Sequence, residues 1–101
     1  MTERLEYDAL AGSLNTKFGI HVDDANTVEA ELTDISEHLL SKRQERFAVV
    51  FRVPNETYLG QGMRHLQHET LGEFDLFLVP ISRDDQGTCY EAVFNRFRQG
   101  D

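Results

Sequence analysis

The chain has 101 residues, and its 18 acidic and 10 basic side chains give a formal net charge of -8. This charge argues against nucleic acid as a partner, because phosphate binding needs clustered Lys and Arg. The hydrophobic fraction of 40% and the charged fraction of 28% are typical of a globular protein, and we expect one domain over residues 1–101. The sequence has no 18-residue apolar run, a charged N-terminus and a single cysteine, Cys89, so we expect a cytoplasmic protein with no membrane segment and no internal disulfide.

A short amphipathic helix is predicted at residues 4–11, where apolar residues recur at helical spacing and Gly12 is placed to end the helix. A helix of this length is not stable alone. We therefore expect it to pack on the surface of a sheet through Leu10 and Leu14.

Six strands are predicted after this helix, because the apolar residues then recur at every second position and turn-forming residues separate the segments. The expected strands are 13–22, 27–36, 45–53, 62–69, 73–82 and 88–97. Their short connections favour an antiparallel meander. The predicted fold class is therefore mainly β, either a small six-stranded antiparallel barrel or a two-layer sandwich, with one short N-terminal helix.

The segment 37–46 is polar except for Leu39 and Leu40, and it ends in the basic run 42–46. We interpret the basic run as a solvated loop between two strands. Whether the segment also holds a helical turn stays open.

The longest near-continuous apolar run, residues 72–82, is predicted as the central strand of the fold. Apolar side chains fall on both of its faces, which indicates that both faces are covered. One face carries Phe74, Leu76 and Leu78. The other face carries Phe77, Val79 and Ile81. Pro80 cannot donate a backbone hydrogen bond, so it suggests a bulge or a frayed edge near the end of this strand.

Two histidines, His65 and His68, stand three residues apart. On a helix, this spacing would place both on one face, where they could bind a metal ion together. On the strand predicted at 62–69, it places them on opposite faces, so we expect no metal site. His68 lies on the same face as Leu66 and is interpreted as a buried histidine with a hydrogen-bond partner.

The remaining polar residues do not form a recognisable catalytic or cofactor motif. Cys89 has no histidine within a few residues and is interpreted as a small buried side chain. Asp84 and Asp85 fit a polar turn beside Gly87. Asn55 begins a glycosylation-like triplet, which we interpret as a loop. We therefore expect no catalytic residue, no cofactor and no metal, and we predict that the protein is not an enzyme.

Two alternatives stay open. One is a small enzyme whose site is assembled from distant residues such as His68, Cys89 and Asp84. The other is a β-barrel that binds a small ligand in an empty interior. The sequence favours a filled interior, because it supplies large side chains on the inward faces. These are Phe18, Phe47, Phe51, Phe74 and Phe94.

Apolar side chains also fall on the outward faces of the third, fifth and sixth predicted strands. The predicted interface consists of Phe77, Val79, Ile81, Val93 and Phe97. The short helix can cover only part of this surface, and a large exposed apolar patch on a small monomer usually marks a contact site. The alternative is that the helix and the loops cover all of it.

A resemblance to known proteins is carried by three segments, Leu71–Ile81, Tyr90–Arg96 and Phe47–Arg52, and by His68 shortly before the first of them. In these segments, the sequence resembles a family of small uncharacterised bacterial proteins that share a domain of unknown function of about this length. Arg64 departs from the large apolar residue that the resemblance leads us to expect at that position.

The resemblance covers nearly the whole chain, and it implies an assembly or accessory role because members of the family are often encoded near proteins with a phage-tail-collar domain. It implies no catalytic residue. We therefore expect a protein–protein interaction module that binds a protein partner or forms a homo-oligomer.

Overall fold

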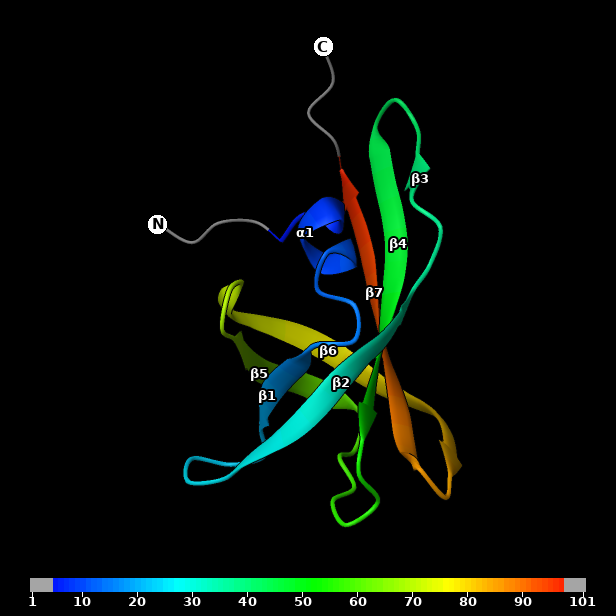
Figure 1. Cartoon of the computed structure of the whole chain (residues 1–101). Helices are drawn as coiled ribbons and strands as arrows, with labels where there is room; N and C mark the ends of the chain where they lie inside the picture. The colour runs from blue at the N-terminus through cyan, green and yellow to red at the C-terminus, as the bar shows by residue number, and fades with distance from the viewer. Residues whose placement is uncertain (1–4, 98–101) are drawn as a thin grey trace.

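The computed structural model describes residues 5–97, which contain one short helix and seven strands (Figure 1). The elements are α1 (Tyr7–Ala11), β1 (Lys17–His21), β2 (Thr27–Ile35), β3 (Leu39–Leu40), β4 (Gln44–Val53), β5 (Gly62–His68), β6 (Gly72–Asp84) and β7 (Gly87–Phe97). No helix within the described residues is long and apolar enough to cross a membrane.

All strand pairs are antiparallel, and the strand order in the sheet is β2-β1-β5-β6-β7-β4-β3. Because β2 also pairs with β4, six of the strands close into a barrel, and β3 lies outside it as an addition to β4. The predicted mainly β fold is confirmed, and closure through the β2–β4 pair distinguishes a barrel from a sandwich. The expected meander is wrong, because β1 pairs with β5 and β4 pairs with β7. Figure 1 shows β3 and the adjoining ends of β4 and β7 projecting beyond the barrel.

The start of β1 differs from the prediction, which placed a strand from residue 13. Residues 12–15 instead continue the helix as a series of turns, in which the Ser13 amide bonds to the Leu10 carbonyl at 3.0 Å and Asn15 adopts a left-handed φ of 67°. Asn tolerates this conformation better than most residues. The strand therefore begins only at Lys17. The predicted first residue of the helix, residue 4, lies outside the described residues.

The strand β3 was not predicted, because two residues show no periodicity. Leu39 and Leu40 pair with Arg46 and Glu45, so the segment 37–46 forms a hairpin that extends β4 and holds no helical turn. Both leucines are exposed. The interpretation of the basic run 42–46 as a loop is correct for residues 42 and 43, which lie in the turn of this hairpin, and wrong for residues 44–46, which begin β4.

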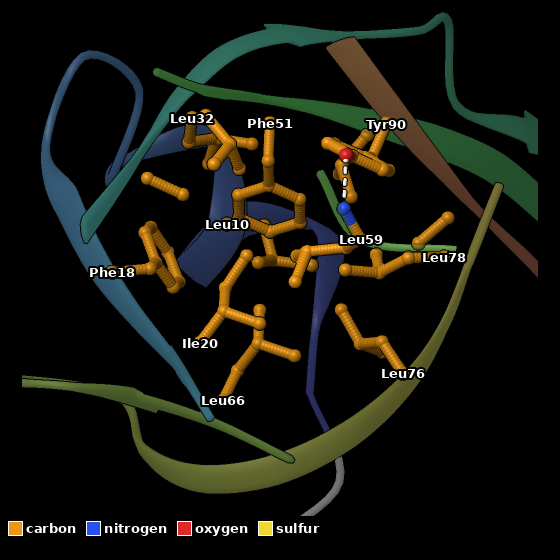
Figure 2. Close-up of a cluster of buried hydrophobic side chains, with 14 of the residues drawn as sticks. Leu10, Phe18, Ile20, Leu32, Phe51, Leu59, Leu66, Leu76, Leu78 and Tyr90 are labelled. Atoms are coloured by element: carbon orange, nitrogen blue, oxygen red, sulfur yellow. Dashed lines mark hydrogen bonds between the residues drawn. The ribbon is translucent and has the colours of Figure 1, made fainter. Parts of the chain in front are cut away.

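The barrel interior is filled by apolar side chains that alternate along each strand. Every second residue of β4, from Phe47 to Val53, is buried, as the period of two predicts. Figure 2 shows side chains from all sides of the barrel meeting in one cluster. Each fully buried side chain of this size contributes about 1.5–3 kcal/mol. Phe18, Phe47, Phe51 and Phe94 belong to this core as expected, whereas Phe74 packs against it only partly buried.

Two segments close the ends of the barrel. Leu10 of α1 is fully buried in the core cluster, and Leu59, from the loop between β4 and β5, is buried there too (Figure 2). The Leu59 amide donates to the Tyr90 hydroxyl at 2.7 Å, so the tyrosine remains satisfied inside the barrel. The helix was expected to lie on the sheet surface. It instead inserts Leu10 into the core, and Leu14 packs against the core partly buried.

A bulge interrupts the pairing of β6 with β7 between Pro80 and Ser82, as the missing donor of Pro80 predicts. Arg64 pairs with Leu76 and is half-buried. Its guanidinium reaches out of the strand and donates to the Gly60 carbonyl at 3.2 Å. This position accommodates an arginine because the charged end lies beside the loop.

Candidate functional site

The outer face of β6 and β7 carries large apolar side chains that remain open to solvent. Phe77 is 48% exposed and Ile81 50%, both on β6. Val93 is 54% exposed and Phe97 80%, both on β7. Val79 lies on the same strand as Phe77 and is half-buried. We call these five residues the outer strip. Within the described residues, neither the helix nor a loop covers it, because α1 packs into the end of the barrel instead.

One apolar residue beside the outer strip was missed by the sequence reasoning. Met63 of β5 is 67% exposed and lies directly opposite Phe77 in the antiparallel β5–β6 pair. Residues directly opposite each other point to the same face of a sheet. The predicted strands contained the signal, since the hairpin formed by 62–69 and 73–82 would place Met63 near Phe77.

The two histidines of β5 point to opposite faces, as predicted. His68 is half-buried and packs against the ring of Phe18, with ring centroids 4.3 Å apart. Its Nδ1 accepts hydrogen bonds from the amides of Thr70 and Leu71, both at 3.1 Å. Its Nε2 lies 3.0 Å from the Thr16 hydroxyl, which itself donates to a carbonyl. Nε2 therefore carries the proton and donates to Thr16. The expected partners are present, and they give His68 a role in holding the β5–β6 turn.

His65 lies on the outer surface between two carboxylates. Its Nδ1 is 2.8 Å from an oxygen of Asp75, and its Nε2 is 2.8 Å from an oxygen of Glu73. The hydrogen bond to Asp75 and, to a smaller extent, the hydrogen bond to Glu73 raise the pKa of His65 above its usual value of 6.5. Both ring nitrogens can donate only when the ring is protonated. Among residues 5–97, no group of three or more His, Cys, Asp or Glu side chains could hold a metal ion.

This arrangement predicts a titration that depends on Asp75. In wild type, the His65 ring should titrate above pH 6.5, and Asp75→Asn should move the midpoint downward because the strongest acceptor loses its charge. Since the folded pKa is raised, the contribution of His65 to stability is present below the unfolded pKa and disappears as the pH rises through the folded pKa. The nuclear magnetic resonance titration of the imidazole tests this, with Asp34→Asn as control. An unchanged midpoint in Asp75→Asn would show that the pair does not form in solution.

A buried ionic cluster lies where the N-terminal segment meets β4 and β7. Glu45 and Arg96 are directly opposite each other in the β4–β7 pair, with Arg96 Nη2 3.1 Å from the carboxylate. His38 Nε2 is 2.7 Å from the other carboxylate oxygen and its ring stacks on Tyr7 at 4.1 Å. Arg96 also donates to the Leu5 carbonyl at 2.6 Å. The cluster therefore connects four parts of the chain, namely the N-terminal segment, the residue before β3, β4 and β7, and no nucleophile takes part in the contacts described.

Electrostatics explain why Glu45 stays charged despite its burial. Burial acts to raise the pKa of the Glu45 carboxyl, but the hydrogen bond from His38 and the charge of Arg96 together outweigh it, so the pKa lies below its usual value. The sequence reasoning missed this cluster. Alternation places Glu45 on the same face as Phe47, and Arg96 on the same face as Phe94, so a signal was present.

The distant residues considered for an enzyme site do not come together. His68 pairs with Gly72 at one end of β6, and Asp84 lies at the other end, about 40 Å away along the extended strand. Asp84 accepts a hydrogen bond from the Gln86 amide at 2.8 Å, which is the turn geometry expected of it. Cys89 is half-buried, opposite Ser82.

The triplet beginning at Asn55 lies in a loop, as predicted. The Asn55 side chain connects this loop to the β6–β7 hairpin by hydrogen bonds. Asn55 Nδ2 donates to the Asp84 carbonyl at 2.6 Å. Its Oδ1 accepts from Arg83 and from Thr88, both at 3.2 Å.

An open groove of about 550 Å³ lies over β1, β2 and the β5–β6 turn. Gly19 contributes only backbone to its lining, and Lys17, Glu29 and Glu73 are among the charged residues around it. His68 also borders it. The groove contains no nucleophile beside a base, so its lining does not indicate a catalytic site.

Comparison with known proteins places the chain in a family without assigning it an activity. No curated protein and no solved structure matches it. The model of a domain of unknown function, DUF6916, matches residues 5–94. Since this match spans most of the chain, the protein belongs to the DUF6916 family.

Proposed function

We propose that this protein is a non-enzymatic interaction module that associates with another protein through the outer strip. The observation that carries the proposal is the exposure of Phe77, Ile81, Val93 and Phe97 on the outer faces of β6 and β7, in a barrel whose interior is already filled. Burial of such side chains against a partner stabilises the complex by about 25 cal/mol per Å² of apolar surface removed from water. Aromatic residues at the centre of an interface often dominate its affinity.

For the partner, we propose either a second copy of the chain or a larger protein. The resemblance to a bacterial family encoded near phage-tail-collar proteins suggests a collar-domain protein as the first to test. The single cysteine suits a reducing compartment, and we propose the cytoplasm.

The main alternative is a module that binds a small ligand. The groove over β1, β2 and the β5–β6 turn supports it, since a volume of about 550 Å³ is within the range of ligand sites. Two features favour the outer strip. The groove is open and lined by several charged residues, whereas most ligand sites are concave and mainly apolar.

The proposal predicts that Phe77→Ser abolishes association but leaves the fold intact. Since Phe77 is half exposed, its replacement should lower the melting temperature much less than the loss of a buried aromatic residue, which costs about 3–5 kcal/mol. Size-exclusion chromatography with light scattering measures association, first of the chain alone and then with a collar-domain protein. Thermal melting measures the fold.

Tyr58→Ser is the matched control, because Tyr58 is an exposed aromatic residue outside the outer strip. It should leave association unchanged. If Phe77→Ser unfolds the protein, Phe77 belongs to the core. If Phe77→Ser remains folded and associates as wild type does, the outer strip is not the contact surface.

A further inference from the structure

The second half of β7 pairs with a strand on one side only, and the N-terminal segment meets it through the hydrogen bond from Arg96 to the Leu5 carbonyl. β7 pairs with β4 from Thr88 to Phe97, but its pairing with β6 runs only from Gly87 to Glu91. Beyond that point β6 diverges from β7, as Figure 1 shows. Within the described residues, the segment 92–97 therefore has a strand on one side only, and we call its other side the β7 edge.

The hydrogen bonds of β4 show which backbone groups of β7 point to this edge. The Ala48 carbonyl accepts from the Ser36 amide at 2.8 Å, and the Ala48 amide donates to the Ser36 hydroxyl at 2.7 Å, so both groups of Ala48 point away from β7. In an antiparallel pair, two opposite residues either both face each other or both face away. Val93 lies opposite Ala48, so its amide and carbonyl point to the β7 edge.

Alternation extends this result to Asn95 and Phe97. The Gln44 carbonyl, opposite Phe97, accepts from the Ser41 amide at 2.9 Å and so also points away from β7. The β7 edge thus presents the amide and carbonyl groups of Val93, Asn95 and Phe97 in one row.

The side chains of this segment lack the features that normally protect an exposed strand edge. Natural edges carry charges, prolines or bulges that prevent pairing with another chain. The segment 92–97 contains no Pro, Lys, Asp or Glu, and its pairing with β4 has no bulge. Its one charged residue, Arg96, lies on the inward face and is engaged with Glu45. Val93 and Phe97 instead present apolar side chains on the outer face.

We propose that two copies of this chain pair through the β7 edge, strand against antiparallel strand, around a twofold axis beside Asn95. This inference rests on the proposed function and names a second copy as the partner. With the axis at Asn95, the backbone groups that point to the β7 edge face those of the second copy. Asn95 then lies opposite Asn95 of the second copy, and Val93 lies opposite Phe97. Three such residue pairs each exchange two backbone hydrogen bonds. The Val–Phe pairs add the aromatic contact with a β-branched residue that stabilises neighbouring strands.

Charge also favours a second copy at this place. A net charge of -8 makes two copies repel each other over most of their surface. The acidic side chains around the groove belong to β2, the β5–β6 turn and the start of β6, and Glu73 and Asp75 lie on the diverging part of β6. The segment 92–97 itself has no acidic residue, so two β7 edges can approach without placing carboxylates opposite each other.

The test uses two opposite charges at the twofold axis. In Asn95→Lys or in Asn95→Asp, each dimer would hold two like charges side by side, so each variant alone should be monomeric while the wild type is dimeric. An equimolar mixture of the two variants should form a one-to-one heterodimer, because a lysine then faces an aspartate. Sedimentation velocity and native mass spectrometry on the full chain measure both. Asn95 is exposed, so both variants should melt within a few degrees of wild type.

Each outcome bears on the inference. A wild type that stays monomeric at every concentration, or variants that dimerise as wild type does, would overturn the β7 pairing. A mixture that stays monomeric would overturn the twofold axis at Asn95. If association survives in both Asn95 variants but is lost in Phe77→Ser, the pairing is wrong and the proposed function stands. Glu29→Lys, on the far side of the barrel, is the control and should leave the dimer unchanged.

Discussion

Replacing Leu10 with Ala should lower the free energy of unfolding by about 2–5 kcal/mol, the range measured for large-to-small changes in protein cores. This is a large effect for a residue of a five-residue helix. The reason is that Leu10 has no exposed surface and closes one end of the barrel among core side chains (Figure 2). Urea denaturation followed by circular dichroism measures the change.

Ala9→Ser is the control, because Ala9 is exposed on the same helix and should change the free energy by less than about 0.5 kcal/mol. An equally small effect of Leu10→Ala would contradict the insertion of the helix. It would mean that α1 lies loosely on the barrel, where it could cover part of an outer face.

Replacing Glu45 with Ala should cost roughly 3–5 kcal/mol, because it leaves the guanidinium of Arg96 partly buried without its carboxylate. Only 8% of the Glu45 side chain and 19% of the Arg96 side chain are exposed. Urea denaturation again measures the loss, and Glu91→Ala is the control on the outer face of β7. A cost below about 1 kcal/mol would show that solvent already screens the cluster.

The same cluster predicts a dependence on pH. The folded pKa of Glu45 lies below its usual value of 4.5, so its contribution to stability is present above that value and is lost as the pH falls through the folded pKa. The stability difference between wild type and Glu45→Ala should therefore shrink in acid. A difference that stays constant down to the folded pKa would contradict the ionic character of the cluster.

Local patterns in the sequence predicted the strands and their inward faces well. Along β4, buried residues alternate with residues that are exposed or half-buried, and Pro80 marks the bulge because it has no amide hydrogen to donate. The predicted strand from residue 13 was wrong at its start, because Asn15 turns the chain in a left-handed conformation that alternation cannot detect. The two residues of β3 are held by pairing with β4 and carry no pattern of their own.

Long-range geometry was beyond reach from the sequence. Closure depends on the β2–β4 pair, and the position of α1 depends on an opening in the barrel that exists only once the strands are placed. The helix was therefore expected on an outer face, and the outer strip was expected to be partly covered. The composition of that strip was predicted, since Phe77 and Val93 follow from alternation, but its exposure could be known only from the fold.

The outer strip is the central claim, and backbone amide chemical shifts recorded as the protein associates test it most directly. The spectra would follow the chain from dilute to concentrated solution, and then with a collar-domain protein added. We expect the largest shift changes at residues 77–81 and 93–97, with little change along the groove at Lys17, Gly19 and Glu29. Changes confined to the groove during association would contradict the claim and would identify the groove as the binding site.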